Sequence, residues 1–82
     1  MDEQTLRATV FAALSRIAPE VTPGEIGTAS PLRDQVDLDS MDYLNFLIDL
    51  HTRLGVDIPE SDYALLGSID DIVRYLAARI GA

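Results

Sequence analysis

The sequence predicts an all-α protein, a small four-helix bundle with three longer helices, one short helix and a long first loop. The chain has only 82 residues, which is enough for a single domain over 1–82. Apolar residues recur at helical spacing in three segments, whereas the one alternating stretch, 55–58, has no second strand to pair with. Cysteine is absent, so packing and not disulfide bonds must hold the fold.

The first helix is predicted over residues 3–18, because its apolar residues return every three or four positions and Pro19 closes the segment. Its apolar stripe consists of Leu6, Val10, Ala13, Leu14 and Ile17.

Prolines and glycines interrupt residues 19–38, which form the long first loop. Two short turns are expected in it. Residues 22–25 have the form of a capping box with proline at the first helical position, and Ser30 followed by Pro31 offers a second helix start. The side chains expected to pin this loop to the core are Ile26, Leu32 and Val36.

The second long helix is predicted over 40–54, with Asp39 or Ser40 as its N-cap and Gly55 after its end. A short helical stretch follows from Pro59 to about Leu66. Ser68, with an acid three residues later, caps the last helix. The apolar stripe of that helix is Ile69, Ile72, Val73, Leu76 and Ile80.

On a helical wheel the second helix carries two apolar faces. The face expected in the core holds Tyr43, Phe46, Leu47, Leu50 and Leu54. A second strip, beginning beside Ser40, holds Met41, Leu44, Ile48 and His51. The polar remainder is Asp42, Asn45, Asp49, Thr52 and Arg53. The strip is either extra core under the loop or an exposed docking patch, and spacing alone leaves both open.

Fourteen acids face six arginines and no lysine, for a net charge of −8. Such a chain would be repelled by nucleic acid and by anionic lipid surfaces. No apolar run approaches the roughly 20 residues that span a bilayer, and the first residues are acidic where a signal peptide is basic. We therefore expect a soluble cytoplasmic protein, with no membrane insertion and no nucleic-acid partner.

Taken alone, the Asp39-Ser40 pair is most simply a helix cap, and the apolar strip then makes the chain a plain helical interaction module. Catalysis by the chain itself is not expected, because His51 lies three turns from Ser40 and no acid and base converge. A calcium loop starting at Asp37 fails, because its sixth position is not glycine and its twelfth is Ile48. We expect no metal site.

Three motifs together resemble the acyl carrier proteins, over nearly the whole chain. The first is Asp-Leu-Asp-Ser-Met-Asp at 37–42, which opens an apolar-rich helix. The second is Leu-Gly-Val-Asp-Ile-Pro at 54–59, and the third is Ser-Ile-Asp-Asp-Ile at 68–72, which introduces the closing helix. The resemblance implies an acyl-carrier-like bundle.

The resemblance also implies that a separate phosphopantetheinyl transferase attaches 4′-phosphopantetheine from coenzyme A to Ser40, flanked by Asp39 and Met41, and that the cofactor thiol then carries acyl groups as thioesters. Partner enzymes, namely an acyl-carrier ligase, an acyltransferase or a synthase, would read Asp39, Met41, Asp42, Leu44, Ile48 and Glu60. The acyl chain would lie near Leu32, Phe46, Leu50, Ile58, Leu66 and Tyr75. We expect a monomer.

Two departures from the family pattern suggest a specialised carrier with a dedicated ligase or transferase, outside housekeeping fatty-acid synthesis. Met41 replaces the usual leucine. Carriers of fatty-acid synthesis commonly have glutamates at the positions of Asn45, His51, Thr52 and Arg53. A peptidyl or D-alanyl carrier remains the alternative, because the attachment motif is similar and the thiol, not the domain, holds the cargo.

Overall fold

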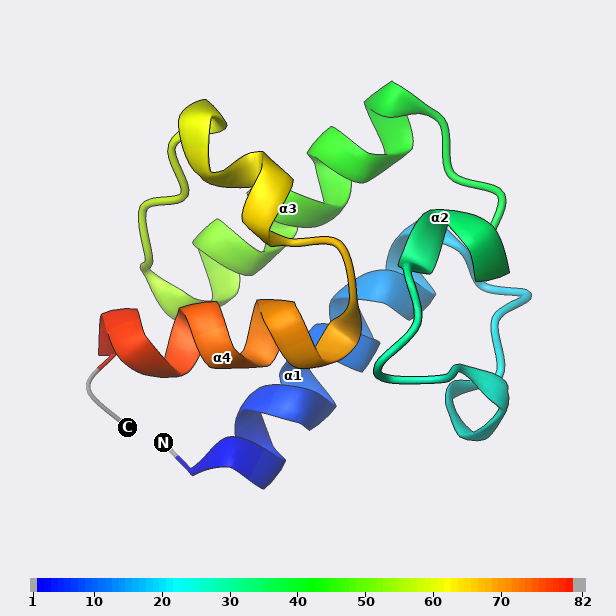
Figure 1. Ribbon diagram of the computed structural model, residues 1–82, viewed down its shortest axis with the longest axis horizontal. Helices are drawn as coiled ribbons and strands as arrows, with labels where there is room; N and C mark the ends of the chain where they lie inside the picture. The colour runs from blue at the N-terminus through cyan, green and yellow to red at the C-terminus, as the bar shows by residue number, and fades with distance from the viewer. Residues whose placement is uncertain (1, 81–82) are drawn as a thin grey trace.

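The computed structural model describes residues 2–80, except for the side chain of Pro23, and these residues form six helical elements without a strand (Figure 1). The three longer helices are α1 (Glu3–Ile17), α3 (Ser40–Leu54) and α4 (Ile69–Ile80). The short ones are η1 (Pro23–Glu25), α2 (Leu32–Gln35) and η2 (Glu60–Leu65). The all-α prediction is confirmed. The expected short helix is η2, which has 3-10 geometry, and the turn expected at Ser30-Pro31 is the single-turn helix α2.

Helix α1 packs against both α3 and α4, and η2 packs against α4 (Figure 1). The apolar stripes predicted for the three long helices meet in one core. Of the predicted stripe residues, only Ile17, Leu54 and Ile80 lie at its edge. The fully buried side chains of this core include Leu6, Val10, Leu14, Phe46, Leu50, Ile69, Ile72 and Leu76.

The first loop is tied to the start of α4 by backbone hydrogen bonds. The Leu32 N–H donates to the Gly67 carbonyl at 2.8 Å, and the Asp70 N–H donates to the Thr28 carbonyl at 2.9 Å. Leu32 and Val36 are buried and Ile26 packs against the core, so the predicted anchors of the loop are confirmed. Helix α2 therefore has a fixed position beside the bundle.

Helix α3 is capped at both ends. The Asp39 carboxylate accepts a hydrogen bond from the Asp42 N–H at 2.8 Å. At the other end Gly55 has φ of 67°, the left-handed conformation that favours glycine after a helix, and its N–H donates to the His51 carbonyl. The choice left open between Asp39 and Ser40 is thus resolved in favour of Asp39.

Among residues 2–80, Asp49 is the one carboxylate in the interior, although the helical wheel groups it with the polar residues of α3. It is only 7% exposed. Its two oxygens accept hydrogen bonds from Arg16 at 2.9 Å and from Arg53 at 2.7 Å. Helix α1 covers this side of α3, and Arg16 brings the charge that makes burial of the carboxylate tolerable.

Within residues 2–80, none of the helices has the length and apolar character needed to cross a membrane.

Candidate functional site

Ser40 is the first residue of α3 and is exposed. Its neighbour Asp39 performs the capping, so the interpretation of Ser40 as a mere cap is wrong. Within residues 2–80 the Ser40 hydroxyl takes part in no side-chain hydrogen bond. Its oxygen is therefore available for chemistry with another molecule.

The chain's only histidine cannot serve as a base for Ser40. His51 lies eleven residues further along α3, which corresponds to roughly 16 Å of helix. Its Nδ1 lies 2.9 Å from the Val56 carbonyl oxygen and 3.6 Å from an Asp57 carboxylate oxygen. The imidazole thus belongs to the far end of α3, and activation of Ser40 must come from elsewhere.

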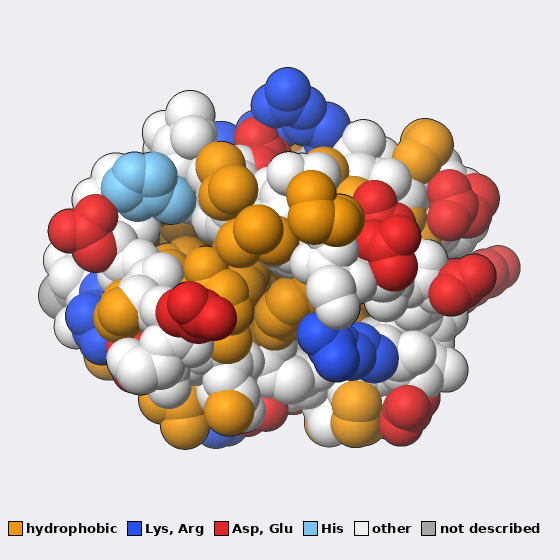
Figure 2. Space-filling view, turned by 90° about the horizontal axis from the view of Figure 1, so that it is seen from above, with side chains coloured by type: hydrophobic (Ala, Val, Ile, Leu, Met, Phe, Trp, Pro, Cys, Tyr) orange, Lys and Arg blue, Asp and Glu red, His pale blue; other side chains and the backbone are white. Residues whose placement is uncertain are grey.

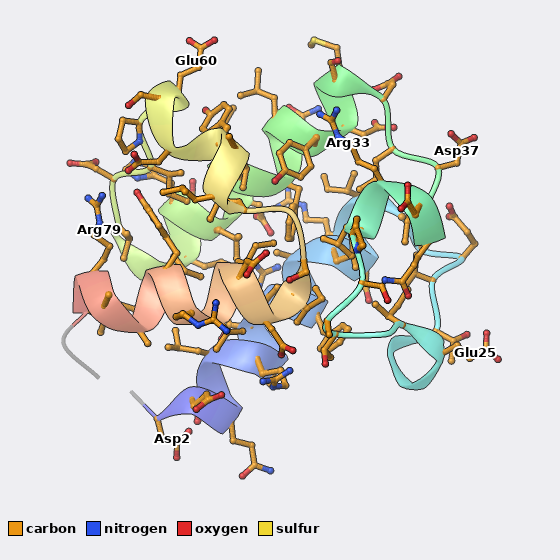
Figure 3. The ribbon with its side chains drawn as sticks, in the orientation of Figure 1. Asp2, Glu25, Arg33, Asp37, Glu60 and Arg79 are labelled. Atoms are coloured by element: carbon orange, nitrogen blue, oxygen red, sulfur yellow. The ribbon has the colours of Figure 1, made fainter. Side chains whose placement is uncertain are left out.

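A hollow of about 300 Å³ opens beside Ser40. Three elements contribute to its wall: α2, the first turns of α3, and η2. Figure 3 shows Arg33 reaching from α2 toward the start of α3, while Glu60 projects from η2. The lining residues are Arg33, Ser40, Tyr43, Leu44, Glu60 and Tyr63.

Tyr43 forms the floor of this region and is held rigidly. Its ring is buried, and its hydroxyl donates to the Leu66 carbonyl. Burial raises the pKa of the Tyr43 phenol, because the charged phenolate would lose its hydration, and the nearby positive charge of Arg33 partly opposes this. The Arg33 guanidinium carbon lies 5.0 Å from the centre of the Tyr43 ring, a cation–π arrangement.

The apolar strip beside Ser40 is a surface feature. Met41 is 64% exposed and Ile48 is 50% exposed, while Leu44 is half-buried. Figure 2 looks onto the face formed by α3 and η2, where a hydrophobic band runs between groups of acidic side chains. The docking-patch interpretation is therefore favoured over extra core. Leu65 of η2, 60% exposed, is a further apolar surface residue that the sequence patterns did not single out.

The acidic residues expected to face partners also gather near Ser40. Asp39 and Glu60 are exposed, and Asp42 is half-buried in the first turn of α3. Glu60 comes from a different element, η2, yet it shares the hollow with Ser40. Two helices thus contribute to one acidic rim around the serine.

The six residues expected near an acyl chain occupy three environments. Leu32, Phe46, Leu50 and Leu66 are at most 1% exposed and lie in the closed core. Tyr75 is half-buried, and its hydroxyl donates to Asp62 at 2.6 Å. Ile58 alone of the six lines a second hollow of about 480 Å³, between α3, η2 and Arg79 of α4.

Two residues of the site escaped the sequence analysis, Arg33 and Tyr63. Tyr63 lines both hollows, and Arg33 lines the one beside Ser40. A signal for Arg33 did exist. It directly precedes residues 34–71, which hold ten acids and a single arginine, Arg53, so it is one of very few cations close in sequence to Ser40.

Comparison with known proteins adds two findings. Residues 8–76 match the family described as "Phosphopantetheine attachment site". The "Acyl carrier protein" of Rhodococcus erythropolis is 31% identical over 70 residues, covering 82% of this chain and 77% of the relative. The "Meromycolate extension acyl carrier protein" of Mycolicibacterium aurum is also 31% identical, over 82% of this chain and 72% of its own. The "Acyl carrier protein" of Thermotoga maritima is 24% identical over 92% of this chain and 96% of its own.

Proposed function

Because this chain belongs to the acyl carrier protein family, it is a phosphopantetheine-dependent acyl carrier, and we propose that Ser40 is the residue that bears the arm. One observation carries this assignment. Ser40 is exposed at the start of α3, and its hydroxyl has no structural task, because Asp39 caps the helix. Ser68, in contrast, is buried and accepts a hydrogen bond from the Asp71 N–H as the cap of α4.

The surroundings of Ser40 suit a 4′-phosphopantetheine arm. Arg33 offers a cation for the phosphate, and Tyr43, Leu44 and Tyr63 offer apolar surface beside it. When bound, the group supplies the thiol that this cysteine-free chain lacks. The protein's own part is to hold Ser40 on a rigid, capped helix and to keep its hydroxyl outside the fold.

Ser40 acts as the acceptor in the attachment step. Its oxygen forms a new bond to the phosphorus of coenzyme A that carries the pantetheine, and the pyrophosphate bond breaks. Adenosine 3′,5′-bisphosphate leaves, and the hydroxyl proton passes to a base. That base belongs to the transferase, because His51 is held at the far end of α3.

We propose that partner enzymes read the exposed residues around Ser40. Acidic side chains steer a basic partner, and the apolar strip supplies buried contact once it docks. The proposed contact residues are Asp39, Met41, Asp42, Leu44, Ile48 and Glu60. The partners are a phosphopantetheinyl transferase and acyl-transferring or synthase enzymes. The chain itself is a cytoplasmic monomer that catalyses no step.

We also propose a specialised cargo. The outer side of α3 carries Asn45, His51 and Thr52, and so lacks the dense carboxylate belt common in carriers of fatty-acid synthesis. The six residues Leu32, Phe46, Leu50, Ile58, Leu66 and Tyr75 are proposed to line the space that shelters the acyl chain. Each buried methylene would contribute about 0.8 kcal/mol before the cost of opening the core.

The attachment site is tested by intact mass. The wild type, Ser40→Ala and Ser61→Ala are each incubated with coenzyme A and a broad-specificity transferase. We expect a gain of one phosphopantetheine in the wild type and in Ser61→Ala, whose exposed serine lies on η2, and none in Ser40→Ala. A modified Ser40→Ala, or an unmodified wild type with several transferases, would refute the assignment.

A folding control accompanies the mass measurement. Ser40→Ala should leave the free energy of unfolding within about 0.5 kcal/mol of wild type, since the hydroxyl is not a cap. Asp39→Ala should lower it by about 1 kcal/mol, because the Asp42 N–H loses its acceptor. Urea unfolding of the three unmodified proteins measures both values.

A further inference from the structure

Arg33 is the exception among the six arginines of the chain. Within residues 2–80 each of the other five forms an ion pair with a carboxylate. Those five are Arg7, Arg16, Arg53, Arg74 and Arg79. Arg33 has no such partner among the described residues, in a chain with fourteen acids. Because no carboxylate among the described residues pairs with it, the Arg33 guanidinium is available to bind an anion from another molecule.

The guanidinium is also held in place. It lies over the Tyr43 ring, with 5.0 Å between its carbon and the ring centre. Tyr43 is fixed by burial and by its hydrogen bond to the Leu66 carbonyl. Helix α2, which carries Arg33, is fixed from the other side, because the Leu32 N–H donates to Gly67 and the Gln35 side chain bonds to Gly27. Little side-chain entropy remains to be lost on binding a ligand there.

The position of Arg33 identifies the anion. Arg33 and Ser40 line the same hollow of about 300 Å³, together with one carboxylate, Glu60. A guanidinium presents its N–H groups as a planar fork that matches the oxygens of a phosphate. The guanidinium carbon lies over the Tyr43 ring, and within residues 2–80 the Arg33 N–H groups make no side-chain hydrogen bond, which leaves them for an anion.

We propose that Arg33 binds the phosphodiester that joins the arm to Ser40, and so sets the direction in which the arm leaves the protein. This inference rests on the proposed attachment at Ser40. Arg33 acts as a positioning residue. With the phosphate held beside α2, the first part of the arm lies along Tyr43 and Tyr63, and does not sweep freely around the start of α3. Loss of the guanidinium frees the base of the arm without altering Ser40.

The test compares the modified forms of the wild type, Arg33→Gln, Arg33→Lys and Arg74→Gln. Arg74 is the matched control, because it is exposed on α4 and its removal changes the net charge equally. Intact mass first confirms one arm per chain. A wild type that stays unmodified counts against the attachment proposal, whereas all later readouts address Arg33 alone.

Phosphorus NMR then reports the environment of the phosphate. We expect the ³¹P chemical shift to move in Arg33→Gln, to move less in Arg33→Lys and to stay at the wild-type value in Arg74→Gln. In the wild type, the Arg33 side-chain Nε–H signal should shift between the unmodified and modified protein. Identical ³¹P shifts in all four proteins, or an unchanged Arg33 signal, would overturn the inference.

A second readout is independent of the spectra. Modification should raise the urea midpoint of unfolding more in the wild type and Arg74→Gln than in Arg33→Gln, because only the latter lacks the new contact. Arg33 is exposed on a four-residue helix, so the unmodified variant is expected to fold. Equal changes on modification in all variants would show that the phosphate has no contact with Arg33.

Discussion

On its inner face α3 is sealed, with Phe46 and Leu50 fully buried, whereas on its outer face Met41 and Ile48 remain 64% and 50% exposed. Both faces are apolar in sequence, and they run along the same fifteen residues. Helix α1 packs against the inner face. The outer face, which begins beside Ser40, has no such cover among residues 2–80 and is the surface that we propose for partner proteins. Apolar spacing thus identifies a helix face that can pack, but not whether the same chain covers it.

The charged groups on the two sides of α3 differ in the same way. On the side of α3 that faces α1, the Asp49 carboxylate has two arginine partners, one from each helix. On the side of Ser40, Arg33 has an aromatic ring beneath it and no carboxylate partner among residues 2–80. The buried Asp49 carboxylate thus has its charge partners within the fold, whereas the exposed Arg33 guanidinium has none among residues 2–80. The incomplete side is where we expect function.

The largest effect should come from truncating the inner apolar face, with the outer face as the comparison. Leu50→Ala should lower the free energy of unfolding by about 2 to 5 kcal/mol, because it leaves a cavity in a fully buried site. Ile48→Ala, on the exposed strip, should change it by no more than about 0.5 kcal/mol. Urea unfolding of both variants measures the contrast. Equal losses would mean that the outer strip belongs to the core after all.

The next effect concerns Asp49. Asp49→Ala should cost about 2 kcal/mol, because two charge-assisted hydrogen bonds to Arg16 and Arg53 are lost. The loss is limited because Arg16 is largely exposed and can return to water. Asp57→Ala, at a fully exposed carboxylate, is the control and should be nearly neutral. A neutral Asp49→Ala would remove the difference between the two sides of α3.

The smallest effect concerns Tyr43, which lies between the core and the site. Tyr43→Phe should cost about 1 kcal/mol at neutral pH, because the Leu66 carbonyl loses its donor. The ring and its stacking with Arg33 remain, so modification of Ser40 should be unaffected. Equilibrium unfolding and the mass assay measure the two quantities on one variant. If the free energy of unfolding of Tyr43→Phe equals that of the wild type, the hydroxyl makes no stabilising hydrogen bond.

The same variant changes the alkaline limit of stability. Burial raises the pKa of Tyr43 above its ordinary value near 10, so the stabilisation it gives is complete below that pH and is lost as the pH rises through the folded-state pKa. Tyr43→Phe should therefore flatten the fall in stability above pH 10. Part of the fall should persist, because burial and the hydrogen bond to Asp62 raise the pKa of Tyr75 as well.

Local patterns predicted the long helices, their stripes and their caps, because each of these depends on residues within a turn or two of one another. Ser68 and Gly55 act as expected for this reason. Asp49 and Arg33 could not be placed in the same way. Of the two partners of Asp49, Arg16 lies 33 residues earlier on another helix. The stacking of Arg33 on Tyr43 depends on how the first loop is docked onto the bundle.

The backbone hydrogen bonds that hold the first loop have a mechanical consequence. They join the segment that carries Arg33 to the start of α4, while Ser40 moves with α3. Since the Arg33 guanidinium also lies over Tyr43 of α3, a movement of α3 against α4 has to change either this contact or the gap between Arg33 and Ser40. A pair of spectroscopic probes, one beside Arg33 and one beside Ser40, would therefore report changes in the spacing between α3 and α4. Such changes could be compared between the protein with and without an acyl group.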